Sequence, residues 1–190
     1  SEVISSESDS WEILKKEIST CELCSLHQTR TQTVFGVGDP NADWLFIGEA
    51  PGKDEDAQGE PFVGRAGRLL NEMIFSLDLC REEIFIANIL KCRPPNNRDP
   101  KASEVDQCFS YLEQQVQLIE PKIIIAVGKV AAQNLLGTDQ TMSQLRGRVH
   151  YFGAIKIPLV VFYHPAYLLR SPSQKPKAWQ DLILAKQMIS

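Results

Sequence analysis

Four short apolar runs divide the chain, at residues 44–48, 84–88, 123–127 and 159–163. Each run is apolar at nearly every position and does not alternate with polar residues. This pattern is typical of strands that are buried on both faces of a parallel sheet. The sequence therefore predicts a central four-stranded, mainly parallel sheet.

The segments between these runs repeat apolar residues every three or four positions, as amphipathic helices do. Helices are predicted over residues 10–19, 64–79, 102–119, 129–136 and 177–189. Ser10 is the predicted N-cap of the first helix. Because strands alternate with helices, the expected fold is an α/β protein, a three-layer α/β/α sandwich.

A polar residue or a glycine closes each apolar run: Glu49, Asn88, Gly128 and His164. In open α/β sheets, ligands bind beyond the carboxyl ends of the strands. The four strand ends are therefore expected to converge on one site.

The chain has 190 residues and 43% hydrophobic content, which suits one domain. Residues 1–10 are acidic and have no apolar stretch, so we interpret them as a mobile tail and not as a signal peptide. Residues 11–190 are the predicted domain. No apolar run reaches the eighteen residues that a membrane span needs. A cytoplasmic monomer without membrane contact is expected.

The net charge of −4 does not by itself indicate a nucleic-acid-binding protein. Its distribution is more informative, since residues 146–177 contain six basic residues and no acidic one. Residues 91–101 contain four basic residues and one acidic residue, Asp99. Such local excess fits either a solvated face or a groove that follows phosphates.

The five cysteines are not expected to form disulfides, because thiols are kept reduced in the cytoplasm. Cys21 and Cys24 form a C-x2-C pair, and Cys92 and Cys108 follow past a strand and on a helix. Together the four cysteines suit a site with four thiolate ligands. Their spacing does not distinguish a zinc ion from an iron–sulfur cluster, since both take four thiolates. Ordinary buried thiols remain the alternative for the last two. Cys80 lies in an apolar context and is interpreted as a core residue, not a ligand.

Two motifs follow strand ends. The first is Gly-Glu-Ala-Pro-Gly at residues 48–52, followed by a glycine-rich segment at 58–67 that opens a helix. Such turns offer backbone N–H groups to a ligand. The second is His-Pro-Ala-Tyr-Leu-Leu-Arg at residues 164–170, which is expected to be a loop. An isolated histidine at a strand end is more often structural, but two leucines exposed on a loop suggest a contact surface.

Four motifs in order, at residues 48–52, 58–67, 88–98 and 164–170, resemble the family 4 uracil-DNA glycosylases. The resemblance spans residues 11–170. It implies a [4Fe–4S] cluster bound by Cys21, Cys24, Cys92 and Cys108. It also implies uracil-containing DNA as the partner, a uracil flipped out to the strand ends, and a histidine loop in the minor groove.

The resemblance and the chemistry of the residues together predict the uracil pocket. Phe62 would stack on the flipped base, and Asn88 would pair with the edge that distinguishes uracil from cytosine. His164 would donate to the other carbonyl as negative charge develops on the departing base. Gly48 and Glu49 complete the expected uracil-binding set.

The group that acts on water is harder to assign. Better-known uracil-DNA glycosylases carry an aspartate where this chain has Ala50. Glu49 and Glu55 are the carboxylates nearby, and either can orient water or stabilise the sugar cation. We favour Glu49, with Glu55 shaping the pocket against the methyl group of thymine.

The expected DNA contacts are Arg65, Leu168, Leu169 and Arg170. The two leucines would fill the stack that the base leaves, and the arginines would contact phosphates.

Two other functions would share part of this motif pattern. A nucleotide-binding module without catalysis would need the glycine turn, but not Phe62, Asn88 and His164 together. A relative that traps uracil-DNA covalently is set aside, because residues 93–103 contain no histidine and position 50 is alanine.

Overall fold

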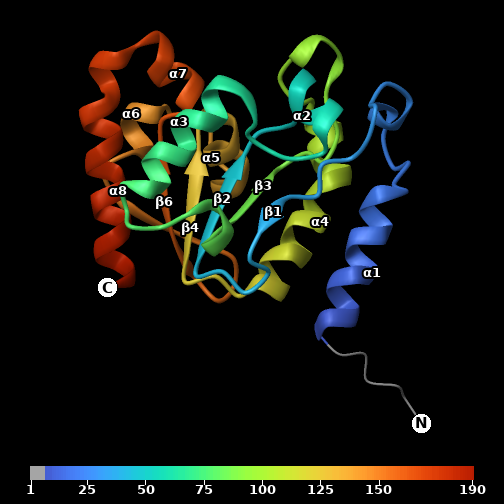
Figure 1. The fold of residues 1–190 in the computed structure, drawn as a ribbon, viewed down its shortest axis with the longest axis horizontal. Coiled ribbons are helices and arrows are strands. Elements are labelled where there is room, and N and C mark those ends of the chain that lie inside the picture. Colours follow the sequence, from blue (N-terminus) through green and yellow to red (C-terminus); the bar gives the residue numbers. More distant parts are fainter. Residues whose placement is uncertain (1–6) are drawn as a thin grey trace.

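A six-stranded sheet forms the centre of the computed structural model, which describes residues 7–190 (Figure 1). The order of the strands across this part of the chain is β1-β3-β2-β4-β6-β5. Their bounds are β1 Val37–Gly38, β2 Trp44–Gly48, β3 Phe85–Asn88, β4 Ile123–Val127, β5 Val149–Phe152 and β6 Ile157–Phe162.

The four inner strands are the four apolar runs, and they pair in parallel as predicted. The prediction of four strands is nevertheless wrong within the described residues, because β1 and β5 add an antiparallel strand at each edge. β1 is only two residues long, and β5 is partly exposed along its length. Neither strand forms an apolar run, because an edge strand that is partly exposed to solvent is not buried on both faces.

The five predicted helices begin and end close to the expected positions: α1 Glu7–Ser19, α3 Gly64–Phe75, α4 Ala102–Ile119, α5 Lys129–Leu136 and α8 Lys175–Ile189. Three short helices were not predicted: α2 Lys53–Gln58, α6 Met142–Leu145 and α7 Pro165–Arg170. Short 3-10 turns join them: η1 Ser25–Gln28, η2 Arg81–Glu83, η3 Pro95–Asn97 and η4 Pro172–Gln174. None of the helices in residues 7–190 is long and apolar enough to cross a membrane.

The start of α1 differs from the prediction. The helix begins at Glu7, so Ser10 lies inside it and is not its N-cap. Glu7 and Asp9 lie in the first turn, where negative side chains are stabilised by the helix dipole. The part of the predicted acidic tail at residues 1–6 lies outside the described residues.

Alternating side chains along each inner strand pack against two helical layers, which confirms the predicted sandwich. Leu45 and Ile47 face the layer of α1, α4 and α5. Trp44 and Phe46 face the layer of α3 and α8. Figure 1 shows α2 and α7 at the end of the sheet to which the arrows of β2 and β4 point. The predicted site residues lie at this end.

Candidate active site

Gly48, Phe62 and Asn88 meet at the carboxyl ends of β2 and β3. A Cβ atom on Gly48 would lie 2.5 Å from Oδ1 of Asn88 and 2.6 Å from the ring of Phe62. Only glycine therefore allows the amide and the ring to lie so close together at this strand end. Three of the predicted uracil-binding residues form one cluster.

The turn that carries Phe62 is held in an unusual backbone conformation. Its φ is 50°, in the left-handed region that few non-glycine residues adopt. Arg81 donates to the carbonyl oxygen of Phe62 at 3.3 Å and also to that of Pro61. Gly67 of α3 packs directly against the same carbonyl of Phe62, where a Cβ would overlap it. The surroundings thus fix the position of the aromatic ring.

His164 is the N-cap of α7, and its side chain accepts a hydrogen bond from the backbone N–H of Ala166 at 3.0 Å. Because Nδ1 accepts, the proton of the neutral ring is on Nε2. Burial, and then the charge of Arg170, lower the pKa of His164 to about 4. The ring centroids of His164 and Phe62 lie 5.5 Å apart. His164 is therefore a neutral donor held beside the aromatic platform.

A cleft of about 610 Å³ opens at this end of the sheet. Glu49 and Glu55 line it after β2, Asp99 lines it from the segment after η3, and His164 and Arg170 line it from α7. The structure thus brings both predicted carboxylates, the histidine and one predicted phosphate contact to the same cleft.

The two carboxylates of the cleft differ in their surroundings. Burial raises the pKa of Glu49 to about 7, and the charge of Asp99 and a hydrogen bond with it act in the same direction. Glu55 is engaged differently, since its Oε1 accepts from the backbone N–H of Gly52 at 3.3 Å at the start of α2. Burial raises the pKa of Glu55, and the contact with Gly52 opposes this.

The segment 165–170 is a helix, α7, and not the predicted loop, because His164 caps it and Pro165 occupies its first turn. Leu168 is 1% exposed and belongs to the same buried cluster as Leu70 of α3, so its predicted exposure is wrong. Leu169 is half-buried and Arg170 is exposed. Helical geometry turns adjacent leucines to different sides, which a loop would not have done.

For the basic segment 91–101 the sequence left two interpretations open, a solvated face and a groove that follows phosphates. Lys91 is 1% exposed and cannot face DNA. Arg98 makes a bidentate pair with Glu104, at 2.7 and 2.8 Å. Lys101 remains exposed, as does Arg65 in the first turn of α3.

All four predicted cysteine ligands line a single cavity between α1, α4 and the segment after β3. Its other walls are largely apolar, with Ile18, Leu23, Leu26 and Leu90 among them. Cys92 and Cys108 are buried, and Cys21 and Cys24 are half-buried. Over residues 7–190, no three His, Cys, Asp or Glu side chains converge closely enough to hold one metal ion. The sulfurs surround a space and do not meet at a point.

Two N–H donors reach the sulfurs of this cavity. Arg30 donates to the carbonyl of Cys21 at 2.7 Å and to Sγ of Cys92 at 3.3 Å. The backbone N–H of Lys91 points to Sγ of Cys108 at 3.4 Å. Burial raises the pKa of Cys108 to about 11, and the nearby charge of Lys91 opposes this. Four thiols with N–H···S donors in an apolar cavity fit the donor set of a [4Fe–4S] cluster.

Cys80 was predicted to be a core residue without a ligand role. It is exposed beside η2, so its predicted burial is wrong. It does not line the cysteine cavity.

Comparison with known proteins agrees with this site. The profile of the Uracil DNA glycosylase superfamily matches residues 35–183. The type-4 uracil-DNA glycosylase of Archaeoglobus fulgidus is 44% identical over 91% of this chain and 90% of its own. The chain belongs to the type-4 uracil-DNA glycosylases. Similar members are those of Sulfurisphaera tokodaii (42% identical, over 91% of this chain and 82% of its own) and Saccharolobus solfataricus (38%, over 96% and 88%).

Two residues of this type-4 site were not predicted from the sequence. Asp99 faces Glu49 across the cleft, although its position in a basic segment suggested only a surface acid. Lys91 donates from Nζ to the carbonyl oxygen of Asn88 at 3.0 Å and to Oε1 of Gln115 at 2.6 Å. Its place next to Cys92 was the one available signal that it belongs to the interior. Burial lowers the pKa of Lys91 to about 8.

Proposed function

We propose that this protein excises uracil from DNA by hydrolysing the N-glycosidic bond, which leaves an abasic site. The observation that carries the proposal is the cluster of Gly48, Phe62, Asn88 and His164 at the carboxyl ends of the strands. Membership of the type-4 family supports it. The target base lies inside the stack of a duplex, so it must first be flipped out to reach these strand ends.

Base recognition is assigned to Phe62 and Asn88. The fixed ring of Phe62 offers a stacking surface to the flipped base. The amide of Asn88 donates to one uracil carbonyl and accepts from the adjacent ring N–H. Cytosine presents the opposite pattern at this edge, so it would leave buried polar groups unpaired. Because Gly48 has no side chain, the amide of Asn88 and the ring of Phe62 lie close enough to contact the same base.

His164 is assigned to the leaving group. Its Nε2–H donates to the second uracil carbonyl as negative charge develops there. The backbone N–H of Ala166 keeps Nδ1 as an acceptor and so selects this tautomer. A neutral donor serves the reaction over the whole neutral pH range, because the pKa of His164 is about 4.

Glu49 is assigned to the sugar and the water. Bond cleavage leaves positive charge on the sugar, which an ionised carboxylate stabilises, and the same carboxylate orients the attacking water. Glu55 is held by the N–H of Gly52, which leaves it less free for this role. We assign Glu55 to the wall of the pocket that would meet the methyl group of thymine.

Contacts with DNA are assigned to Arg65, Leu169 and Arg170. Arg65 and Arg170 would contact phosphates, and Leu169 would enter the stack that the uracil leaves. Leu168 supports this surface from inside, since it packs α7 against α3.

The cysteine cavity is assigned to a [4Fe–4S] cluster held by Cys21, Cys24, Cys92 and Cys108. When bound, the cluster supplies a covalent tie between the segment after α1, the segment after β3 and α4. That tie would hold the strand end that carries Asn88.

Incubation with a uracil-containing oligonucleotide, followed by alkali, tests the function directly. Strand breaks at the uracil position are expected for the wild type, and few for Asn88→Asp, because a carboxylate accepts but does not donate. Binding of the oligonucleotide without strand breaks would favour a nucleotide-binding module and overturn the proposal.

A further inference from the structure

A second cavity, of about 440 Å³, adjoins the cleft at His164, and Glu49, Glu55 and Asp99 are not among its wall residues. Tyr163 and Tyr167 form one wall, and Thr141 and Ser143 at the start of α6 form another. We call it the tyrosine pocket. None of its wall residues is acidic.

The tyrosine pocket is continuous with the catalytic cleft, since four residues line both: Gly128, Lys129, His164 and Tyr167. A strand whose uracil lies in the cleft therefore has its next nucleotide within reach of the pocket. The function proposed above leaves this pocket without a role.

We propose that the tyrosine pocket binds the nucleotide adjacent to the flipped uracil on the same strand. The inference rests on the proposed function and adds to it a subsite for substrate. The neighbouring base would stack on Tyr167, and the phosphate that joins the two nucleotides would lie near Lys129.

The chemistry of the walls suits a nucleotide. The ring centroids of Tyr163 and Tyr167 lie 4.9 Å apart. Tyr163 is buried and supports the half-buried ring of Tyr167, on which any base can stack. Ser143 is exposed and offers a hydroxyl group to the polar edge of a base, whereas the hydroxyl of Thr141 caps α6 through Gln144. Lys129 is exposed at the mouth and offers a positive charge. Aromatic surface combined with positive charge is typical of sites for single-stranded nucleic acid.

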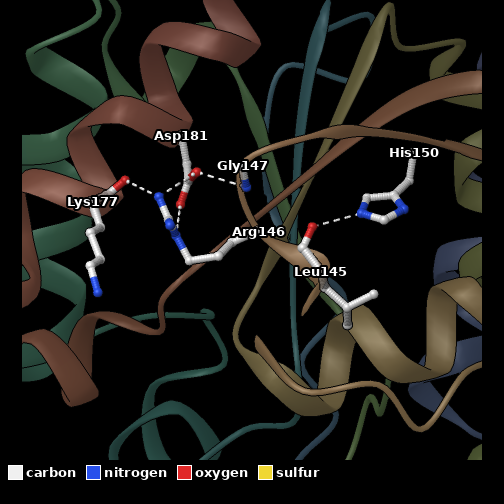
Figure 2. A network of polar contacts seen from close by, with 6 residues as sticks. All are labelled: Leu145, Arg146, Gly147, His150, Lys177 and Asp181. Atoms are coloured by element: carbon white, nitrogen blue, oxygen red, sulfur yellow. Dashed lines mark hydrogen bonds and ion pairs between the residues drawn. The ribbon is translucent and has the colours of Figure 1, made fainter. Parts of the chain in front are cut away.

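The walls of the pocket are fastened to the core by the network in Figure 2. Arg146, which follows α6, donates to Asp181 of α8 at 3.0 and 3.1 Å and to the carbonyl of Lys177 at 3.1 Å. The carboxylate of Asp181 is almost fully buried and also accepts from the backbone N–H of Gly147 at 3.2 Å. The guanidinium of Arg146 lies 5.8 Å from the ring centroid of Tyr163.

This network joins α6, α8 and Tyr163 in one rigid unit. A pocket that is already formed loses little conformational entropy when a ligand binds. Arg146 belongs to a basic stretch that the sequence left open as a solvated face or a phosphate-binding groove, and its guanidinium is engaged by Asp181 and by the carbonyl of Lys177.

The test uses three uracil-containing oligonucleotides under single-turnover conditions. One has normal bases on both sides of the uracil, and the others lack the base on its 5′ or its 3′ side. For the wild type, loss of one of the two neighbouring bases should lower kcat/KM roughly tenfold, the size of one stacking contact. In Tyr167→Ala the same loss should have almost no effect. Tyr151→Ala, which removes an exposed tyrosine on β5, should behave as the wild type.

Ser143→Trp provides a second variant, because Ser143 is an exposed wall residue of the pocket and does not line the catalytic cleft. It should slow the normal oligonucleotide about as much as loss of the neighbouring base does in the wild type. Equal effects of base loss in the wild type and in Tyr167→Ala, together with full activity of Ser143→Trp, would overturn the subsite. If the wild type removed no uracil from any oligonucleotide, the proposed function itself would be at fault.

Discussion

The ammonium group of Lys91 lies 3.0 Å from the carbonyl oxygen of Asn88. Its own backbone N–H points to Sγ of Cys108 at 3.4 Å. None of the ion pairs in the described part of the chain involves Lys91, which is 1% exposed. One buried side chain therefore connects the residue that is proposed to read uracil with the cysteine cavity.

Lys91→Met should lower kcat/KM for uracil excision by about 10- to 100-fold, because a buried hydrogen bond to a charged group is lost on the strand end that carries Asn88. The measurement is a double-mutant cycle with Asn88→Ala, and the double variant should be little worse than Asn88→Ala alone. Additive losses would show that Lys91 acts elsewhere. Lys186→Met, which removes an exposed lysine paired with Asp78, is the matched control.

Glu49 must be ionised to stabilise a sugar cation, and its pKa is about 7. The rate should therefore rise as the pH increases from 6 to 8. Asp99→Asn removes a negative charge that raises this pKa, so the acid limb of the kcat/KM profile should move to lower pH. Asp139→Asn, on an exposed position outside the cleft, should leave the limb in place. An unchanged limb in Asp99→Asn would contradict the role of Glu49.

His164→Ala should lower the single-turnover rate on the order of 10²-fold and leave DNA affinity nearly unchanged, because the lost donor acts mainly in the transition state. The histidine is neutral at the pH of the assay, since its pKa is about 4. The remaining activity should therefore keep the same pH profile between 6 and 8. A profile that loses its shape would show that His164 titrates in the reaction.

Leu168→Ala and Leu169→Ala should separate packing from DNA binding. Leu168→Ala should reduce the free energy of unfolding by about 2–5 kcal/mol, as measured by denaturant, because it opens a cavity between α7 and α3. Leu169→Ala should change stability little. Its excision rate should fall more on duplex than on single-stranded DNA, where there is no stack to fill. Equal losses on both substrates would assign Leu169 to packing as well.

Protein purified without oxygen should be brown and contain about four irons per chain. Cys92→Ala should lose both the colour and the fold, since the cysteine cavity joins three segments. Cys80→Ala should change neither, because Cys80 is exposed and lies outside the cavity. A colourless, active wild type with one zinc per chain would contradict the cluster assignment.

The inner strands could be predicted because burial on both faces leaves a continuous apolar run. The long helices could be predicted because burial of one face leaves apolar residues every three or four positions. The bounds of β2, β4, α4 and α5 agree with the sequence to the residue. The edge strands could not be predicted, because pairing with a neighbour on one side needs only backbone groups. Val37–Gly38 carries no side-chain pattern at all.

The candidate site shows what a linear pattern cannot reveal. Counting charges left Lys91, Arg98 and Arg146 either on a solvated face or in a phosphate-binding groove, whereas Gln115, Glu104 and Asp181 engage them in the interior or at its margin. These partners lie 24, 6 and 35 residues away in the sequence. Only the folded structure shows which basic residues pair with groups inside the protein and which stay exposed and available to phosphates.

The close approach at Gly48 has a consequence for protein engineering. Any side chain at position 48 would overlap both Asn88 and Phe62, which lie 40 and 14 residues further along the sequence. A library that aims at excision of a different base should therefore keep Gly48 constant. It should randomise positions 62 and 88 jointly, because a change in the volume of one side chain alters the space left for the other.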